Sequence, residues 1–284
     1  MGFMKDKIIL ITGCSSGIGF DAVFSLKERG HRVIGSCRKI EDVQKLLAKG
    51  IEAVQLDVSD SSSIQNAFAE VLAKTEGRLD VLINNAGYGQ AGALEDISRD
   101  VLRAQFETNV FGLVELTNLV IPVMRKQGYG RIINLSSILG VISMPFRGAY
   151  NASKYAVEGV SDTLRLELKS SGINVITIEP GPIESRFRDN CVDNSLNNID
   201  MQNSYFSMQY ERMLKTFKQK KTDSIFTRKA DAVTQKLIHA IESQRPKAKY
   251  PITFPAHFML FLKWILSTKM LDKFFLLVSK KELS

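Results

Sequence analysis

Cysteine and histidine are scarce in this chain of 284 residues, which has three of each. The cysteines form no Cys-x-x-Cys pair and are too few for a disulfide framework, so the sequence fits a reducing compartment. No cluster of Cys and His residues has the spacing of metal ligands. The composition therefore indicates neither a disulfide-stapled protein nor one with a metal site.

Long uncharged hydrophobic runs are also missing. Near the N-terminus, Lys5 and Lys7 precede only a short apolar run, 8–12, which is too brief for a signal peptide. The apolar segment 255–280 is interrupted by charges, so it does not approach the ~18 residues that a membrane-spanning helix needs. The interrupting residues are Lys263, Lys269, Asp272 and Lys273. We therefore expect a cytoplasmic protein.

Acidic residues are in short supply only in the C-terminal third. Residues 201–284 contain 16 Lys and Arg against 6 Asp and Glu, whereas residues 1–200 contain 22 against 24. The basic residues of this third alternate with apolar stretches that need burial, so we predict no nucleic-acid partner. The basic, Phe- and Leu-rich segment 255–280 could lie on an anionic bilayer as a peripheral contact, or pack over a substrate cleft or a subunit partner.

Short β-branched runs alternate with longer amphipathic segments. The runs are nearly all apolar, as strands covered on both faces must be, and their alternation with helices implies a parallel sheet. We predict one α/β domain, 1–284, with a three-layered, doubly wound parallel sheet of Rossmann type and a C-terminal helical extension. The expected strands are 8–12, 32–36, 53–57, 81–84, 131–135, 174–179 and 250–254, and the expected helices are 17–30, 40–49, 60–76, 98–127, 150–170 and 229–243.

The region 186–225 interrupts this alternation. It is polar at first and then amphipathic, and a long insertion of this kind is usually a functional lid or a mobile loop. We expect a lid over an apolar substrate. The side chains expected to line it are Met201, Tyr205, Phe206 and Met208.

A glycine-rich turn, Thr12-Gly13-Cys14-Ser15-Ser16-Gly17-Ile18-Gly19, follows the first expected strand. Gly13 would allow the tight turn, Gly17 would let the backbone approach a pyrophosphate, and Gly19 would let the helix lie close to the sheet. The pyrophosphate would meet the N–H groups of the helix that begins near Ser16. A plain tight turn is the alternative, but the place of the motif between strand and helix favours a dinucleotide.

The second expected strand ends without the carboxylate that usually binds the ribose of NAD. Arg38 and Lys39 stand there instead and could pair with a 2′-phosphate, so we favour NADP(H) over NAD(H), although a solvated basic turn would look the same. After the third strand, Asp57, followed by Val58, could accept a hydrogen bond from adenine or cap the next helix. Asn84-Asn85-Ala86-Gly87 puts small residues where backbone would pass beneath a ribose.

Tyr150 and Lys154 lie four residues apart, and hence on one face of the expected helix. An ammonium group near a phenol favours the phenolate and lowers the phenol pKa from its reference near ~10. A phenol tuned in this way can act as a general acid and base near neutral pH. The pair alone could equally be a half-buried tyrosine and a solvated lysine.

These motifs together resemble those of the short-chain dehydrogenases/reductases in their single-domain form. The resemblance implies that Tyr150 is the proton donor and acceptor and that Lys154 lowers its pKa and reaches the nicotinamide ribose. Ser137 would hold the substrate oxygen, with Ser136 as the alternative, and Asn109 would hold a water in a proton relay to Lys154. The motifs that carry the resemblance are 12–19, 84–87, Ser137, and Tyr150 with Lys154.

The resemblance covers about residues 5–245 and extends to a loop beside the nicotinamide. This loop is Pro180-Gly181-Pro182-Ile183, and Ser185 stands where the family often has a threonine that bonds the carboxamide. The family also implies a homodimer or homotetramer with contacts through the helices 98–127 and 150–170.

The resemblance implies an NADP(H)-dependent oxidoreductase that interconverts a carbonyl and an alcohol by hydride transfer. The apolar lid and tail suggest a steroid-, retinoid- or lipid-like substrate, and the sequence most resembles the branch of 17β-hydroxysteroid and retinol dehydrogenase-like members. Two alternatives stay open. One is a reductase of 3-ketoacyl groups on an acyl carrier protein, and the other is a catalytically silent NADP(H)-binding regulator.

Overall fold

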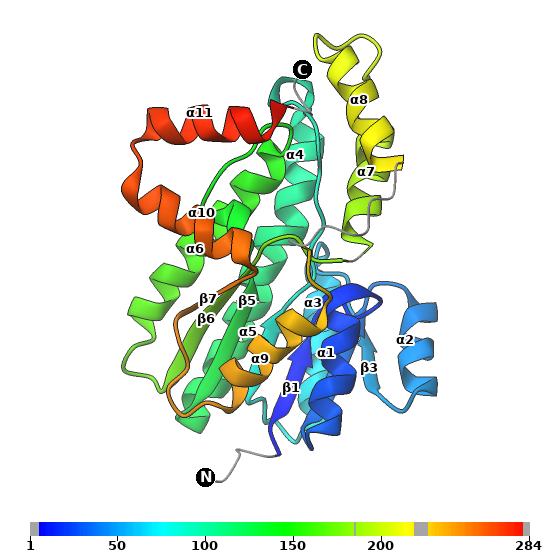
Figure 1. Ribbon diagram of the computed structural model, residues 1–284. Helices are drawn as coiled ribbons and strands as arrows, with labels where there is room; N and C mark the ends of the chain where they lie inside the picture. The colour runs from blue at the N-terminus through cyan, green and yellow to red at the C-terminus, as the bar shows by residue number, and fades with distance from the viewer. Residues whose placement is uncertain (1–5, 185, 219–226, 281–284) are drawn as a thin grey trace.

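Seven parallel strands form the centre of the molecule in the computed structural model, which describes residues 6–184, 186–218 and 227–280 (Figure 1). Their order across the sheet is β3-β2-β1-β4-β5-β6-β7. All neighbours pair in parallel, so the predicted doubly wound α/β architecture is confirmed. The strands are β1 Ile8–Ile11, β2 Arg32–Cys37, β3 Glu52–Gln55, β4 Val81–Asn84, β5 Gly130–Leu135, β6 Ile173–Pro180 and β7 Lys249–Ile252.

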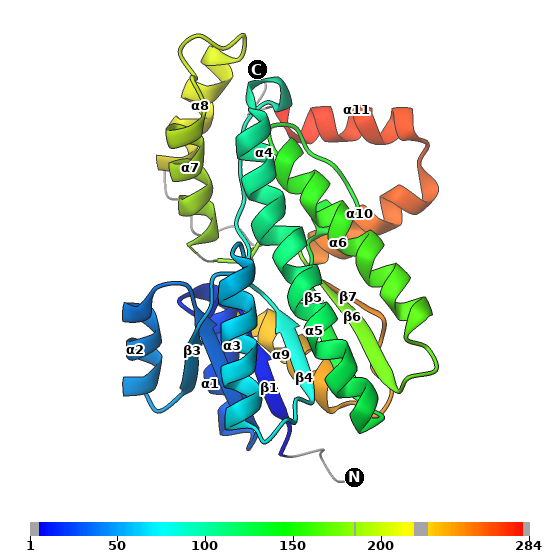
Figure 2. The same ribbon diagram turned by 180° about the vertical axis from the view of Figure 1, so that it is seen from behind.

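Helices cover both faces of the sheet, which gives three layers (Figures 1 and 2). Along β1, Ile9 and Ile11 face one helix layer, and Ile8 and Leu10 face the other. The strand has no polar face because neither side meets water. Full burial of a side chain of this size contributes about 1.5–3 kcal/mol. One layer is α1 Gly17–Glu28, α2 Ile40–Ala48 and α9 Asp231–Glu242, and the other is α3 Ser61–Lys74, α5 Gly112–Gln127 and α6 Gly148–Glu167.

β1 and β4 are neighbours at the point where the strand order reverses. The chain runs outward from β1 to β3 on one side, and then continues from β4 to β7 on the other. In sheets of this kind, ligands bind in the crevice beyond the carboxyl ends of the two strands at the reversal. The glycine-rich turn follows β1 and the 84–87 motif closes β4, so both flank this crevice.

The predicted single helix 98–127 is divided into three consecutive segments. The middle one is π-helical, and π-helical turns inside α-helices are frequent at functional sites. Asn109 lies in it, and its amide accepts a hydrogen bond from the Tyr88 N–H at 3.0 Å and donates to the Tyr88 carbonyl at 2.9 Å. Through Asn109, the π-helical segment thus binds the loop that follows β4. The segments are α4 Arg99–Phe106, η2 Glu107–Phe111 and α5.

Two pairs of helices stand on opposite sides above the carboxyl edge of the sheet (Figure 1). The predicted lid forms one pair, and the C-terminal segment forms the other. Residues 219–225 of the predicted lid lie outside the described residues. Among the described residues, no helix is both long enough and apolar enough to cross a membrane. The pairs are α7 Phe187–Asn198 with α8 Ser207–Lys218, and α10 Phe254–Ile265 with α11 Thr268–Val278; the short turns are η1 Leu94–Asp96 and η3 Ile138–Gly140.

Candidate active site

Three polar side chains meet beyond the carboxyl end of β5. Ser137 occupies the N-cap position of η3, and its hydroxyl accepts a hydrogen bond from the Leu139 N–H at 3.1 Å. Tyr150 and Lys154 lie in the first two turns of α6. The Ser137 hydroxyl lies close enough to the Tyr150 phenol to lower its pKa, and Lys154 Nζ lies 5.8 Å from the centre of the Tyr150 ring. The structure thus brings the predicted trio together.

Burial governs the pKa values of Tyr150 and Lys154. Lys154 is buried and donates to the Leu135 carbonyl at 2.6 Å, and desolvation lowers its pKa to about 8 against the opposing effect of Glu158. Burial also raises the pKa of the Tyr150 phenol, and the hydrogen bond with Ser137 acts in the opposite direction. The predicted lowering of the Tyr150 pKa is therefore wrong for this arrangement, because burial dominates and Lys154 is not among the groups that shift this pKa.

Gly87 leaves space beside Lys154 and Asn109. A Cβ placed on Gly87 would lie 3.1 Å from Asn109 Oδ1 and 3.8 Å from Lys154 Nζ. Asn109 Nδ2 also donates to Ser153 Oγ at 3.0 Å, which joins η2 to α6. Together with its two bonds to Tyr88, this engages both polar atoms of the amide, so the Asn109 side chain positions the β4 loop. Its part in a proton relay stays a prediction.

The glycine-rich turn is clamped by the residues that follow β4. Asn85 Nδ2 donates to the carbonyls of Thr12 and Gly13 at 2.8 and 3.0 Å. Thr12 Oγ1 accepts from the N–H groups of Asn85 and Ala86 at 3.0 and 2.9 Å. Gly13 has a φ of 72°, and a Cβ there would lie 2.8 Å from Ala86 Cα. The two turns therefore touch only because position 13 is glycine.

The rest of the turn leads into α1, which begins at Gly17 with Ser16 at the N-cap position. Within the described chain, Ser16 makes no side-chain capping bond, which leaves the first amides of α1 for an anion. Ser15 is exposed at the turn. Ile18 packs against the core, and a Cβ on Gly19 would lie 2.5 Å from the Gly13 carbonyl. This arrangement fits a pyrophosphate.

The basic pair stands where β2 ends. Arg38 and Lys39 are both exposed, and the Arg38 carbonyl accepts a hydrogen bond from Gln55 Nε2 at 3.0 Å. Lys39 occupies the N-cap position of α2. A phosphate can therefore approach both cations from solvent.

Asp57 is held by its own turn. Its Oδ1 accepts from the Ser59 N–H at 2.9 Å and from the Ser59 hydroxyl at 2.6 Å. Helix α3 is capped by Asp60, which accepts from the Ser62 N–H at 2.8 Å. The alternative that Asp57 caps this helix is therefore wrong, and its contact with adenine stays a prediction.

Asn84 and Val58 are both buried. Asn84 Nδ2 donates to Thr117 Oγ1 at 3.0 Å and to Asn134 Oδ1 at 2.9 Å, between the sheet and α5. The Asn84 side chain therefore supports the helix–sheet contact, and the passage of this stretch beneath a ribose stays a prediction. The Val58 carbonyl lies against Gly112, the first residue of α5.

The loop after β6 is fastened to β7. Pro180 ends β6, and the next N–H, of Gly181, donates to the Ile252 carbonyl at 3.0 Å. Ile183 continues the loop in an isolated parallel bridge. Ser185 lies outside the described residues, so its predicted contact has no placement here.

Helix α7 supplies two residues that the sequence did not reveal as neighbours of Tyr150. The Phe187 and Tyr150 rings meet edge to face, with 5.3 Å between their centres. A Cβ on Gly89 would lie 2.6 Å from Cys191 Sγ and 2.8 Å from Phe187 Cζ. Their i, i+4 spacing in an otherwise polar stretch is the signal that could have identified them.

The side chains expected to line the lid are arranged differently. Tyr205 and Met208 are 86% and 64% exposed, so the prediction that they line an apolar pocket is wrong. The Phe206 and Phe146 rings meet edge to face, with 5.3 Å between their centres. Met201 packs against the same buried apolar cluster, which includes Phe146 and Tyr210. Met201 and Phe206 therefore hold the lid on the body of the protein. The lid residue that contacts Tyr150 is Phe187 of α7.

The chain is similar to several known proteins. Residues 7–195 match the family model for short chain dehydrogenase. An oxidoreductase of Escherichia coli strain K12, YbbO, is 40% identical over 272 residues, which cover 96% of this chain and 95% of YbbO. A 3-ketodihydrosphingosine reductase of Bacteroides thetaiotaomicron is 39% identical over 236 residues, or 83% and 84% of the two chains. The crystal structure of a short-chain dehydrogenase from Streptomyces avermitilis is 29% identical, covers 98% of this chain and 97% of its own, and has a TM-score of 0.77.

Proposed function

Because this chain belongs to the short-chain dehydrogenase family and is an oxidoreductase of that family, we propose that it interconverts a carbonyl and an alcohol on an apolar substrate with NADP(H). The observation that carries the proposal is the meeting of Ser137, Tyr150 and Lys154 beside the crevice of the sheet. A hydroxyl, a phenol and an amine in this arrangement suit the transfer of a proton to or from a substrate oxygen.

The residues around the crevice fit a nicotinamide dinucleotide. The pyrophosphate would meet the amides at the start of α1, beyond the turn that requires glycine at position 13. The ribose would pass over Gly87, beside Lys154, where a side chain would fill the space. Arg38 and Lys39 would pair with a 2′-phosphate, which is why we propose NADP(H). When bound, the nicotinamide supplies or accepts the hydride.

The side chains of the chain itself handle the oxygen and its proton. The Ser137 and Tyr150 hydroxyls would donate to the substrate oxygen and stabilise the negative charge that develops there. The raised pKa of Tyr150 keeps its phenol protonated near neutral pH, so its hydroxyl can give the proton in reduction. Lys154, with a pKa of about 8, can exchange a proton with its surroundings.

An apolar substrate follows from the surroundings of Tyr150. Phe187 covers one side of its ring, and Cys191 lies one helical turn further along α7. The relative named for the reduction of 3-ketodihydrosphingosine supports a lipid-like ketone. A steroid-, retinoid- or lipid-like carbonyl compound or alcohol is the substrate class that we propose.

The experiment that tests the proposal is a screen of NADPH oxidation with carbonyl compounds of graded chain length and ring size. We expect turnover that rises with the apolar area of the substrate. Turnover confined to short acetoacetyl thioesters would indicate the 3-ketoacyl reductase alternative. Binding of NADPH with no turnover of any carbonyl compound would favour a silent regulator and would contradict the proposal.

A further inference from the structure

The two C-terminal helices are apolar on two opposite sides. Their inner side packs on the protein, where Ala256 of α10 and Phe275 of α11 are buried with Ile138 and Ile142. A surface helix of a monomer presents polar residues on the side that faces away from the core. Here the outer side is apolar as well. The following six residues, each about half exposed or more, form the outer apolar face: Phe261, Trp264, Ile265, Met270, Leu276 and Leu277.

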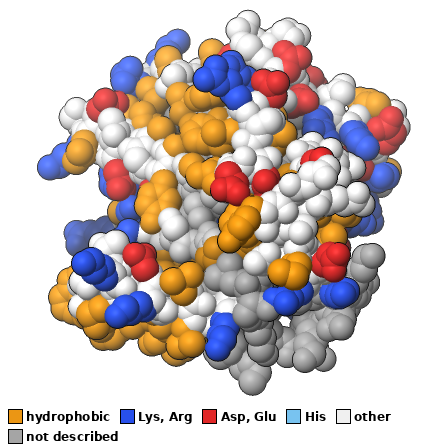
Figure 3. Space-filling view, turned by 90° about the horizontal axis from the view of Figure 1, so that it is seen from above, with side chains coloured by type: hydrophobic (Ala, Val, Ile, Leu, Met, Phe, Trp, Pro, Cys, Tyr) orange, Lys and Arg blue, Asp and Glu red, His pale blue; other side chains and the backbone are white. Residues whose placement is uncertain are grey.

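The charges beside the outer apolar face are nearly all positive. Lys263, Lys269 and Lys273 lie on the same two helices and are exposed, against the single carboxylate Asp272. In the view from above, hydrophobic side chains gather with lysine and arginine side chains at the lower left, on the side where α10 and α11 lie (Figure 3). An apolar surface bordered by cations is complementary to anionic headgroups over acyl chains.

We propose that the outer apolar face of α10 and α11 binds the surface of an anionic lipid bilayer. Tryptophan, phenylalanine and leucine beside lysine are the composition of helices that lie in a membrane interface. No helix among the described residues could span the bilayer, so the contact is a peripheral one. A second copy of the chain on this face would bring lysines of like charge toward one another, which disfavours a dimer there.

The same helices lie against the catalytic side of the molecule. The inner side of α10 packs on η3, which begins directly after Ser137, and Lys263 Nζ donates a hydrogen bond to the Val141 carbonyl. A bilayer on the outer apolar face would therefore be separated from the turn after Ser137 by α10. If the proposed function holds, the contact would bring the source of an apolar substrate to the catalytic side of the molecule.

The chain carries its own probe for this contact, because its one tryptophan, Trp264, is 82% exposed on the outer apolar face. The full chain would be mixed with vesicles of phosphatidylglycerol or of phosphatidylcholine, and Trp264 emission and flotation would be measured. We expect a blue shift and flotation with phosphatidylglycerol, and weak binding to phosphatidylcholine. High salt should weaken the binding.

Two double variants and one control complete the test. Phe261→Ser with Leu277→Ser, and Lys269→Glu with Lys273→Glu, should each weaken vesicle binding by about tenfold or more. The control, Leu47→Ser with Leu166→Ser, removes comparably exposed leucines from α2 and α6 and should bind vesicles as the parent does. Circular dichroism and NADPH binding check that each variant folds.

The proposal would be overturned if the full chain failed to float with phosphatidylglycerol vesicles. It would also be overturned if the control variant lost as much vesicle binding as the two test variants. A third result would also contradict the proposal: a parent that self-associates, a monomeric Phe261→Ser, Leu277→Ser variant, and no vesicle binding by either protein. That result would show that a second copy of the chain covers the outer apolar face. Vesicle binding is measured without turnover, so its failure is distinguishable from failure of the proposed function.

Discussion

Burial moves two neighbouring side chains of α6 toward their neutral forms. It raises the pKa of the Tyr150 phenol and lowers that of Lys154 to about 8. A protonated phenol is the group that carbonyl reduction consumes, and a lysine that titrates near 8 can restore a proton under ordinary conditions. At the scale of single residues, the site therefore assigns proton donation to Tyr150 and the return of a proton to Lys154.

Tyr150→Phe should remove the proton donor and leave the rest of the site in place. We expect kcat to fall roughly 10²–10⁴-fold, as for the loss of a general acid, with NADPH affinity nearly unchanged. The control is Tyr155→Phe on the same helix, whose hydroxyl donates to the Val141 carbonyl at 2.6 Å. Steady-state kinetics and NADPH titration measure both effects, and a Tyr150→Phe enzyme with parental kcat would refute the assignment.

Arg38→Glu should act on cofactor choice and not on chemistry. The change replaces a cation at the end of β2 with an anion, so the 2′-phosphate of NADPH loses a partner. We expect NADPH binding to weaken by about 1.5–3 kcal/mol, the usual contribution of a hydrogen bond to a charged group, with a much smaller effect on NADH. Lys49→Glu, an exposed position at the far end of α2, is the control. Equal losses for the two cofactors would remove the basis for NADP(H).

Glu158→Gln should change the pH dependence of the reaction. Glu158 is buried one turn beyond Lys154, accepts from Lys249 Nζ at 2.7 Å, and raises the pKa of Lys154. Without its charge, Lys154 should lose its proton at a lower pH, so the alkaline limb of the kcat profile should move to lower pH. Asp162→Asn is the control, because Asp162 also binds Lys249 but is not among the groups that shift the pKa of Lys154.

A purely structural role for Glu158 would lower kcat at every pH and leave the position of the limb unchanged. That result, or an equal shift in the Asp162→Asn enzyme, would contradict this account of the Lys154 pKa.

At the scale of elements, the contact between the start of α5 and the loop after β3 depends on a single glycine. A Cβ on Gly112 would lie 1.7 Å from the Val58 carbonyl. Alanine normally stabilises a helix interior relative to glycine by about 1 kcal/mol. Here the added methyl group has no room, so the sign of the effect should reverse.

Gly112→Ala should therefore destabilise the protein by about 1–3 kcal/mol, as overpacking of a close contact does. Displacement of the Val58 loop should also weaken NADPH binding. The matched control is Gly159→Ala in α6, where a Cβ would meet no described atom within 4 Å and the change should stabilise the protein. Denaturant unfolding measures both, and stabilisation by Gly112→Ala would disprove the tight contact.

Sequence patterns predicted the strands and crossovers well because those elements are determined by burial. β1 is apolar at every position since both of its faces meet helices, and the glycine turn after it has a local backbone requirement at Gly13. The π-helical break was not predictable, because it accompanies hydrogen bonds that Asn109 donates to the Tyr88 carbonyl and the Ser153 hydroxyl, partners distant in the sequence. The direction of the Tyr150 pKa shift was missed for the same reason, since it depends on how folding buries the phenol.

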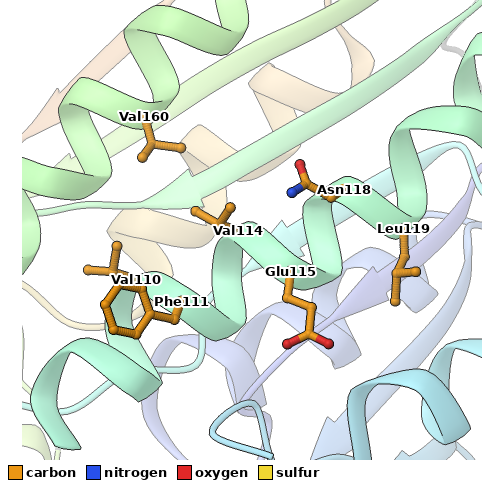
Figure 4. Close-up of a pocket in the computed structure, with 7 residues that line it drawn as sticks. All are labelled: Val110, Phe111, Val114, Glu115, Asn118, Leu119 and Val160. Atoms are coloured by element: carbon orange, nitrogen blue, oxygen red, sulfur yellow. The ribbon is translucent and has the colours of Figure 1, made fainter. Parts of the chain in front are cut away.

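At the scale of the whole molecule, one apolar region remains on the outer surface of α5 and α6. A shallow groove of about 570 Å³ lies there, with Val160 of α6 on one side and the residues of η2 and α5 on the other (Figure 4). Phe111 is 51% exposed at its edge. The residues that line it are Val110, Phe111, Val114, Glu115, Asn118, Leu119 and Val160. The resemblance to the family implies subunit contacts through these same two helices.

We propose that a second copy of the chain covers this groove, because two copies related by a twofold axis would pair α5 and α6 with the same helices of the partner. Phe111→Glu should then give a monomer, since each interface would have to bury two carboxylates without partners. Sedimentation equilibrium would compare this variant with the parent and with Leu47→Glu, a position on α2 that is 50% exposed. A monomeric parent at micromolar concentration, or dissociation by Leu47→Glu as well, would show that α5 and α6 do not form the subunit contact. Retention of NADPH binding in the Phe111→Glu monomer would show that the crevice beyond β1 and β4 is complete within one chain.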